Sequence, residues 1–577
     1  MKKKLLPALI VTGLIILVVI IMGITALINK YTPTKKTEDL KEYFNISSDD
    51  EAALIVDNEL SDYKAKIIDK KIYVDYKFVH DSLNSRFYWD ANENVLLYTT
   101  ASDIISAAAD SNSYSVTKQT NDFGYPIVKA TSDSALIALD YVKQYSNITF
   151  KSYDDPARIV ITSKWDEIDS ATVSKSTQVR VKGGIKSPIL KEVKKDDKIT
   201  ILDSGDKWDK IATEDGVIGY IKGKALSESK KTKLTNPDYE EETFTHIKKD
   251  KDICLAWNQV TSQSANSKVP QVISSTKGIN VMSPTWFYLN DNNGNLADIA
   301  SKDYVSYCHS QGIEVWGLFS NFENTDVDAA YVLTHTSTRT TLINQIMSAA
   351  FNYELDGVNI DFENITEAAY GDSYIEFIRE LAIKCHNNGI SLSVDVTVPA
   401  SFNKFFNRSD MANFADYIVI MGYDEHYKGS DAGSVSSIPW VTEGVESTLK
   451  EVPADQIILG MPFYTRIWEL TPKEDDDAVT DTEDQSKYTV ASQVYSMDAA
   501  AAQLATNNAT AALDDESGQN YAEWSVSNKL YKVWLEDTTS LEKRLKLVDD
   551  NKLAGAAFWK LGFENSSVWD TVIKYLN

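Results

Sequence analysis

The chain has 577 residues, which is too long for one domain and fits about three or four. Its formal net charge of −26 argues against nucleic-acid binding, because that function needs a basic surface. The three cysteines, Cys254, Cys308 and Cys385, are odd in number and far apart. They predict buried thiols rather than a disulfide framework or a metal-ligand set, and we expect no metal and no cofactor.

The first 28 residues predict a membrane anchor. Three lysines, Lys2 to Lys4, precede an apolar run from Leu5 to Ile28. At about 1.5 Å per residue this run spans about 36 Å as a helix, enough for a hydrocarbon core of about 30 Å. The apolar region of a cleaved signal peptide usually has only about 7–15 residues. We therefore expect one uncleaved transmembrane signal anchor, with a long cleaved signal as the alternative, followed by a polar linker at residues 29–50.

Residues 51–165 contain two segments with the same order of predicted elements: an apolar strand, a short helix and a hairpin of two strands. The first begins at Lys71 and the second at Ser134, a repeat of about 63 residues. Their pattern resembles the small α+β stalk-type domain at the N-terminus of some copper amine oxidases and in Gram-positive surface proteins. The resemblance implies no copper or oxidase chemistry, because His80 stands alone in this segment.

Residues 169–228 predict a small β-barrel. Short alternating strands, such as Val179 to Val181 and Lys198 to Leu202, are separated by Gly, Asp and Lys turns. The Val-Arg opening, the central Trp208 and the closing Gly-Tyr-Ile resemble a bacterial SH3 domain. In that family the module often contacts cell-wall peptide; a plain spacer barrel is the alternative. A second polar linker follows at residues 229–245.

Residues 246–577 alternate apolar strands with helix-like stretches, the pattern of a parallel sheet. The eight candidate strands lie at residues 253–257, 279–286, 314–319, 357–361, 392–397, 417–423, 457–463 and 556–559. They predict a (β/α)8 TIM barrel with its active site at the C-terminal ends of the strands. The interval before the last strand is too long for one helix. It predicts an inserted α+β lobe at about residues 467–540, with acidic runs at 473–477 and 482–484 in a solvated loop.

The fourth candidate strand carries polar groups on one face. Residues 356–363 read Asp-Gly-Val-Asn-Ile-Asp-Phe-Glu, so Asn359, Asp361 and Glu363 alternate with apolar residues. Buried acids are costly unless they are paired or used. A solvated edge strand is the alternative, but Glu363 comes at the C-terminal end of a predicted barrel strand, where active sites lie.

This stretch resembles the Asp-x-x-Asp-x-Asp-x-Glu motif of glycoside hydrolase family 18. Two further motifs follow in the family's order: residues 421–424, similar to Met-x-Tyr-Asp, and Trp559, where the family has its floor tryptophan. Residues 423–427, 437–441 and 559–562 further resemble the branch that contains spore-cortex-lytic N-acetylglucosaminidases. The resemblance covers residues 246–577 and implies a retaining, substrate-assisted mechanism, in which the sugar's own 2-acetamido oxygen attacks the anomeric carbon.

The resemblance assigns four residues to this chemistry. Glu363 would protonate the leaving oxygen and then act as the base for water. Asp361 would accept the acetamido N–H and hold the group for attack. Tyr423 would donate its hydroxyl to the acetamido oxygen, and Trp559 would stack under the sugar.

Three further residues are candidates for substrate binding. Asp424 and Arg466 would make contacts near the cleaved bond, with an ordinary structural ion pair as the alternative. Asn359 occupies the position of the family's middle acid. An aspartate there could share a proton with Asp361, whereas asparagine cannot ionise but can still form a hydrogen bond to Asp361. We expect activity to persist with an altered pH profile.

These features predict a membrane-anchored glycosidase whose catalytic part is extracellular. Its substrate would be an N-acetylated polysaccharide, cleaved at β-1,4 bonds of N-acetylglucosamine; peptidoglycan is favoured by the anchor and the wall-type modules. A chitinase-like hydrolase is one alternative. A non-catalytic, lectin-like glycan-binding protein is another, although such proteins usually lose the glutamate that stands here as Glu363. The expected partners are the glycan, the membrane and, through the SH3-like module, wall peptide.

Overall fold

The computed structural model describes residues 5–363, 365, 368–473 and 484–576. The chain divides into two compact units. The N-terminal unit comprises Met1–Trp89, Ala107–Tyr114 and Asn121–Glu241, and the barrel unit comprises Asp90–Ser106, Ser115–Thr120 and Glu242–Asn577. Two short stretches from early in the sequence therefore belong with the C-terminal part of the chain.

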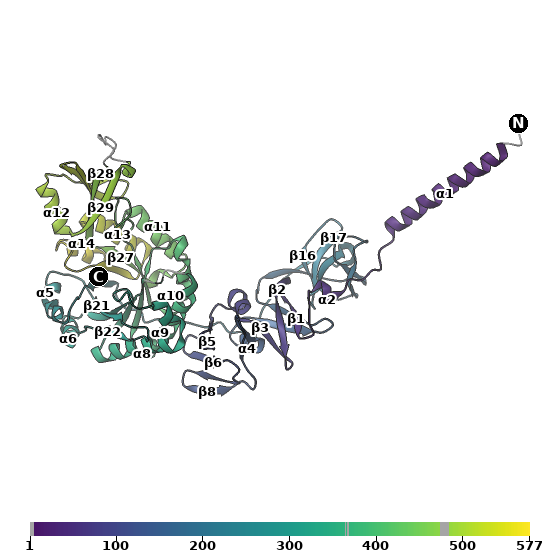
Figure 1. Ribbon diagram of the computed structural model, residues 1–577, viewed down its shortest axis with the longest axis horizontal. Helices are drawn as coiled ribbons and strands as arrows, with labels where there is room; N and C mark the ends of the chain where they lie inside the picture. The colour runs from purple at the N-terminus through teal and green to yellow at the C-terminus, as the bar shows by residue number, and fades with distance from the viewer. Residues whose placement is uncertain (1–4, 364, 366–367, 474–483, 577) are drawn as a thin grey trace. The chain divides into compact units, whose positions relative to one another are not determined.

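Eight parallel strands form a closed ring in the described part of the barrel unit (Figure 1). They are β20 (Ile253–Asn258), β21 (Val281–Leu289), β23 (Glu314–Ser320), β24 (Gly357–Asp361), β25 (Ser391–Thr397), β26 (Tyr417–Met421), β27 (Ile457–Pro462) and β33 (Gly555–Trp559). Each strand pairs with the next in this order, and β33 pairs with β20 to close the ring. A short strand, β22 (Leu296–Asp298), pairs antiparallel with β21. The predicted (β/α)8 barrel is confirmed, and each candidate strand supplies one strand of the ring.

Helices surround the ring (Figure 1). They are α5 (Val269–Ile273), α6 (Lys302–Ser310), α7 (Ala329–Thr334), α8 (Thr336–Tyr353), α9 (Gly371–His386), α10 (Arg408–Phe414), α11 (Ile438–Thr448), α13 (Thr538–Asn551) and α14 (Val568–Tyr575). Val358 and Ile360 on β24 join the large apolar core, which also contains buried residues of these helices. Trp316 on β23 belongs to a separate cluster formed by strand residues, inside the ring. Val358 and Ile360 face the surrounding helices. Because side chains alternate along a strand, Asn359 and Asp361 face the inside of the ring.

An α+β lobe is inserted between β27 and α13. It contains β28 (Tyr464–Pro472), β29 (Tyr488–Ser496), α12 (Met497–Thr506), β30 (Ala512–Asp514), β31 (Gln519–Val526) and β32 (Lys529–Leu535). Its strands pair in the order β29, β28, β32, β31, β30. The lobe begins at Tyr464, slightly before the predicted start at residue 467. Most of the predicted acidic runs, residues 474–477 and 482–483, lie outside the described residues.

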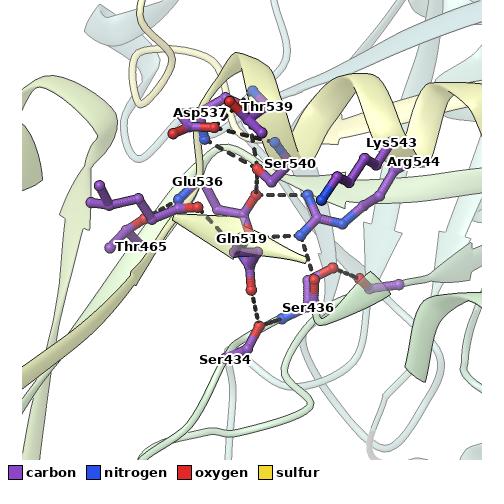
Figure 2. A network of polar contacts seen from close by, with 12 residues as sticks. Ser434, Ser436, Thr465, Gln519, Glu536, Asp537, Thr539, Ser540, Lys543 and Arg544 are labelled. Atoms are coloured by element: carbon purple, nitrogen blue, oxygen red, sulfur yellow. Dashed lines mark hydrogen bonds and ion pairs between the residues drawn. The ribbon is translucent and has the colours of Figure 1, made fainter. Parts of the chain in front are cut away.

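A buried ion pair connects the lobe to α13 (Figure 2). Arg544 Nη1 donates to Glu536 Oε2 across 2.6 Å, and its Nη2 donates to Oε1 across 2.8 Å. Glu536 follows β32 and also accepts hydrogen bonds from Gln519 Nε2 and Ser540 Oγ, each at 2.8 Å. Arg544 also donates to the carbonyl oxygen of Ser436, before α11. The pair thus joins lobe, helix and barrel loop in one network.

Residues 90–106 belong to the barrel unit because their side chains bind its helices. Asp90 Oδ2 accepts from the backbone N–H of Thr336 across 2.7 Å, and Glu93 Oε2 accepts from that of Ser337 across 3.0 Å. These are N–H groups of the first turn of α8, which have no partner inside the helix. Thr99 Oγ1 donates to Glu376 Oε1 on α9 across 2.8 Å, where both side chains are buried.

Three sheets account for the strands before the barrel. The first pairs in the order β11 (Thr149–Tyr153), β12 (Arg158–Thr162), β1 (Glu51–Val56), β2 (Glu59–Ile68), β3 (Lys71–Asp75), β10 (Ala135–Ala138), β9 (Val128–Ala130). The second pairs in the order β15 (Ile189–Val193), β14 (Thr177–Arg180), β18 (Ile218–Lys222), β17 (Trp208–Thr213), β16 (Lys198–Asp203), β13 (Glu167–Thr172), β19 (Lys230–Lys233). The third pairs in the order β4 (Phe87–Asp90), β5 (Val95–Thr99), β6 (Ile104–Ala108), β7 (Ser113–Val116), β8 (Gln119–Asp122).

The two repeat segments share their local order but not their pairing. In each, a strand precedes a short helix, β3 before α3 (Tyr76–Phe78) and β10 before α4 (Leu139–Gln144). The hairpin β11–β12 joins the same sheet as β3 and β10, whereas β4 and β5 pair in the third sheet. The tandem-repeat and SH3-like assignments stay predictions. Both predicted linkers contain short elements, α2 (Leu40–Tyr43) in the first and β19 in the second.

The N-terminal helix α1 (Leu5–Tyr31) covers the predicted anchor. Its segment Leu9–Tyr31 is long and apolar enough to cross a membrane. Length and composition alone support this, and a signal sequence at this end of a chain would meet the same criterion. The flanking Lys2 to Lys4 lie outside the described residues.

Candidate active site

A cavity of about 620 Å³ opens at the C-terminal ends of the barrel strands. The acids that line it are Glu323, Asp361, Glu363, Asp395, Asp424 and Glu425. Its aromatic lining consists of Trp257, Phe322, Phe402, Tyr423, Tyr427, Trp440 and Trp559. Five of the seven predicted site residues line this cavity: Asp361, Glu363, Tyr423, Asp424 and Trp559.

Asp361 is the buried acid of the cavity. It ends β24, and only 5% of its surface is exposed. Its Oδ1 is buried and has no hydrogen-bond partner among the described residues. Burial raises the pKa of Asp361 well above its usual range, and the nearby Asp395, Glu363 and Glu323 raise it further. A carboxyl oxygen in this state is an acceptor without a donor, which is costly unless something else supplies the donor.

Glu363 follows the same strand by two residues and is exposed. Although the residue is exposed, the cavity wall shields its carboxyl group from much of the solvent. This desolvation raises the pKa of Glu363, and the negative charges of Asp424 and Glu323 raise it further. A carboxyl group with a raised pKa keeps its proton closer to neutral pH and can serve as a general acid.

Two aromatic side chains complete the part of the cavity around these acids. The Tyr423 ring packs edge-to-face on Tyr464, with 6.2 Å between ring centroids. Burial raises the pKa of Tyr423 well above its usual range, so its hydroxyl keeps its proton and can donate it in a hydrogen bond. Trp559, at the end of β33, packs edge-to-face on Trp257, with 5.9 Å between centroids.

Asp424 and Arg466 form the ordinary ion pair that was the alternative to substrate contact. Arg466 Nη2 lies 3.8 Å from Asp424 Oδ1, and its Nη1 donates to Ser492 Oγ across 3.2 Å. Arg466 comes from lobe strand β28 and is not among the residues that line the cavity. Asp424 does line it and also accepts a hydrogen bond from Tyr464.

The prediction that Asn359 forms a hydrogen bond to Asp361 is wrong. Asn359 is fully buried and does not line the cavity. Its Oδ1 accepts from Trp257 Nε1 and Ser283 Oγ, each at 2.9 Å, and its Nδ2 donates to Asp395 Oδ1 across 2.7 Å. These hydrogen bonds use both the oxygen and the nitrogen of the Asn359 amide. The geometry therefore gives no support to direct substrate binding by Asn359.

Asp395 on β25 is a buried acid of the cavity that sequence reasoning missed. It is 4% exposed and lines the cavity with Asp361. Burial raises the pKa of Asp395 well above its usual range, the hydrogen bond from Asn359 lowers it, and Glu363 raises it. The available signal was a single carboxylate inside the apolar strand 391–397, with the same alternation as the fourth strand.

None of the three cysteines lines this cavity. Cys254, Cys308 and Cys385 are free and buried, and burial raises the pKa of the Cys254 thiol to about 12. Within the described ranges, no group of three or more His, Cys, Asp or Glu side chains has the arrangement of a metal site.

Comparisons with known proteins identify the domain that carries this cavity. Residues 323–564 match the family model described as Glycosyl hydrolases family 18. The chain is 24% identical over 302 residues to the uncharacterized glycosylase YvbX of Bacillus subtilis (strain 168), covering 49% of this chain and 81% of that protein. It is 24% identical over 287 residues to the cortical fragment-lytic enzyme of the same organism, covering 48% of this chain and 63% of the relative.

A solved structure is also similar, at lower sequence identity. The spore cortex-lytic enzyme SleL of Bacillus megaterium QM B1551 is 19% identical, with a TM-score of 0.49, and the alignment covers 60% of this chain and 77% of that one. Among the sequence relatives, the match spans 63% of the cortical fragment-lytic enzyme and 52% of the sporulation-specific glycosylase YdhD of Bacillus subtilis (strain 168).

Proposed function

The chain carries a family 18 glycoside hydrolase domain, and we propose that this domain cleaves β-1,4 bonds at N-acetylglucosamine in peptidoglycan. The proposed mechanism is retaining and substrate-assisted: the 2-acetamido oxygen of the sugar attacks its own anomeric carbon. We also propose that helix α1 anchors the protein in the membrane and that the barrel acts outside the cell.

The observation that carries the mechanism is the unpartnered Asp361 Oδ1. This oxygen is buried, belongs to a residue that lines the cavity and has no donor among the described residues. An amide N–H of the substrate would supply that donor, which is how an acetamido group would be held for attack. The requirement for this group is what would restrict the substrate to 2-acetamido sugars.

Glu363 would carry the proton transfers. Its raised pKa favours the protonated form, which gives its proton to the leaving oxygen as the glycosidic bond breaks. The attack of the acetamido oxygen forms a cyclic oxazolinium ion. Water then attacks the anomeric carbon of this ion, and the Glu363 carboxylate removes a proton from that water, which returns Glu363 to its acid form. Tyr423 would donate to the acetamido oxygen, and Trp559 would supply the flat apolar surface under the sugar.

Two observations and one prediction favour peptidoglycan over chitin as the substrate. A helix with the length and composition of a membrane anchor would keep the enzyme at the cell's own wall. The predicted SH3-like module fits contact with wall peptide. Relatives of the barrel include proteins named for cortical or spore-cortex lysis. Chitin offers the same 2-acetamido sugar, so a chitinase-like hydrolase is the second candidate, supported by a relative named as a probable endochitinase from Caenorhabditis elegans.

The test is digestion of purified peptidoglycan by the detergent-solubilised full chain, with the products identified by mass spectrometry after reduction of the new ends. We expect new reducing-end N-acetylglucosamine. Glu363→Gln should lower the rate by at least about 10²–10⁴-fold, the usual contribution of a general acid. The matched control is Glu314→Gln at the start of β23, whose carboxylate pairs with Lys249 at 2.8 Å and should be dispensable for turnover.

The possible products separate the alternatives. Turnover of chitin oligomers without turnover of peptidoglycan would establish the chitinase alternative. Binding of peptidoglycan without release of new ends by the unmutated chain would instead support a lectin-like protein. New reducing-end N-acetylmuramic acid would contradict the proposed bond specificity, because that sugar would then occupy the position of the attacking acetamido group.

A further inference from the structure

Asp395 and Asp361 occupy adjacent positions on neighbouring strands. The parallel pairing of β24 with β25 aligns Asn359 with Ser393 and Ile360 with Val394. Continued by one residue, this register sets Asp361 beside Asp395, across the spacing of about 4.8 Å between neighbouring strands. Both residues line the cavity, and both are buried.

The Asn359 amide fixes one side of the Asp395 carboxyl. An indole N–H can only donate, so the Asn359 atom that accepts from Trp257 at 2.9 Å must be the amide oxygen. The hydrogen bond from Ser283 Oγ to the same oxygen agrees with this assignment. The other amide atom is therefore a donor, and it binds Asp395 Oδ1 at 2.7 Å. The neighbour of Asp395 on β24 in this register is Asp361.

Among the residues that the structure describes, no cation is found to act on the two carboxyl groups. The described groups that interact electrostatically with Asp361 or Asp395, or bind them, are Asn359 on β24, Glu363 after β24, Glu323 after β23, Tyr374 on α9 and Tyr423 after β26. All are neutral or acidic. Two adjacent buried carboxylates without a cation cannot both ionise near neutral pH, and such pairs hold one proton between them.

We propose that Asp395 replaces the acid missing at position 359, and that by sharing one proton with Asp361 it orients the Asp361 carboxyl toward the acetamido group. The proposal rests on the proposed function for the identity of the substrate group. Asp395 is a positioning residue: it acts on the substrate through Asp361. One proton stays within the pair throughout the cycle, so the pair keeps a single negative charge. That charge faces the positive charge that develops when the acetamido oxygen attacks.

The experiment compares Asp395→Asn and Asp395→Ala in the full chain. An asparagine amide can donate permanently to Asp361, as the shared proton does, so we expect Asp395→Asn to keep kcat within about tenfold of the unmutated value. Alanine removes the donor, and we expect kcat to fall on the order of 10²-fold with little change in KM, as for a misplaced catalytic group. The higher of the pair's two titration steps should vanish in both variants.

A titration that does not depend on turnover separates this proposal from the proposed function. Infrared difference spectra of the full chain, labelled with ¹³C-aspartate, report carboxyl protonation as the pH is raised. We expect the unmutated protein to hold a carboxyl proton well above the ordinary aspartate range and Asp395→Asn to lose that signal. The control is Asp416→Asn: this carboxylate is also buried but accepts from Leu392 N at 2.8 Å and Ile247 N at 2.6 Å, outside the cavity.

Each outcome decides the matter. If Asp395→Asn keeps the high-pH carboxyl signal, or if its pH–rate profile differs from the unmutated one only in height, proton sharing is refuted. If the signal disappears with Asp395→Asn and survives Asp416→Asn, proton sharing is supported. If that pattern holds while the unmutated chain releases no new ends from any acetamido glycan, the proposed function fails and the proton-sharing pair still stands.

Discussion

Tyr464 donates its phenolic hydrogen to Asp424 Oδ1 across 2.5 Å. Tyr464 is the first residue of the lobe strand β28, and Asp424 follows barrel strand β26, so this bond connects the inserted lobe to the rim of the cavity. Asp424 has a second lobe partner, Arg466, only at 3.8 Å. The tyrosine is therefore the closer lobe contact of this cavity carboxylate.

The first prediction concerns this bond. Tyr464→Phe keeps the buried ring and removes the donor, so we expect the free energy of unfolding to fall by about 1 kcal/mol. Glycan turnover should also fall, because Asp424 loses its fixed position near Glu363. Denaturant titration and steady-state kinetics measure the two effects. Tyr531→Phe is the matched control, since Tyr531 donates to Glu469 at 2.7 Å on the same lobe sheet; equal effects on kinetics from both variants would refute the role of Tyr464.

The second prediction concerns the alkaline limb of the pH–rate profile. Desolvation is the largest cause that raises the pKa of Glu363, and the negative charge of Asp424 is the second. Asp424→Asn removes this repulsion and lowers that pKa, so Glu363 loses its acid proton at a lower pH. We expect the alkaline limb of kcat/KM to move to lower pH. Glu323→Gln should move it in the same direction by a smaller amount, and a shift to higher pH would show that Asp424 acts otherwise.

The third prediction concerns Asn359. Asn359→Asp would set a carboxyl group where the amide now donates to Asp395 Oδ1, so three acids would share the barrel interior. The pair of Asp361 and Asp395 holds a proton above the ordinary carboxyl range because burial raises the pKa of both groups, so the folded state binds more protons there than the unfolded chain. The free energy of unfolding must therefore decrease as pH rises through that range, and more steeply in the variant.

Near neutral pH we expect Asn359→Asp to cost roughly 1–3 kcal/mol, the usual penalty for leaving a buried polar group without its partner. Urea titrations at several pH values give the slope. The pH–rate profile should change as well, because the added acid competes for the shared proton. An unchanged profile would contradict the importance of an amide at this position.

The fourth prediction tests the buried pair of Figure 2. Arg544→Ala leaves Glu536 buried without its cation, and we expect a loss of about 3–5 kcal/mol in the free energy of unfolding. Replacing both residues with leucine should recover most of that loss, since a buried pair is often no more stabilising than apolar side chains. Lys546→Ala removes an exposed pair with Asp550 on the same helix and should leave the denaturation midpoint unchanged. A double variant as unstable as Arg544→Ala would show that the arginine acts through other contacts.

The barrel was predictable because it depends on local signals. Apolar runs of strand length recur between helical stretches, and the polar residues at their C-terminal ends share one cavity. The partner of Asn359 was not predictable, because it depends on the register between β24 and β25, which no local pattern encodes. Asp395 stands out as the single carboxylate of its strand, but its place beside Asp361 could not be predicted, because it depends on the same strand pairing.

The segment of residues 90–106 has a consequence for how this chain folds. Thr99 bonds to Glu376 across 277 residues of sequence, and Asp90 bonds to Thr336 across 246. Forming contacts between residues this far apart in the sequence costs chain entropy, because a long loop must close first. Such contacts slow folding. During synthesis this segment is made long before α8 and α9. It can therefore bind to the barrel only after hundreds of further residues have been added. A fragment that starts at residue 246 would leave the first turn of α8 without Asp90 and Glu93.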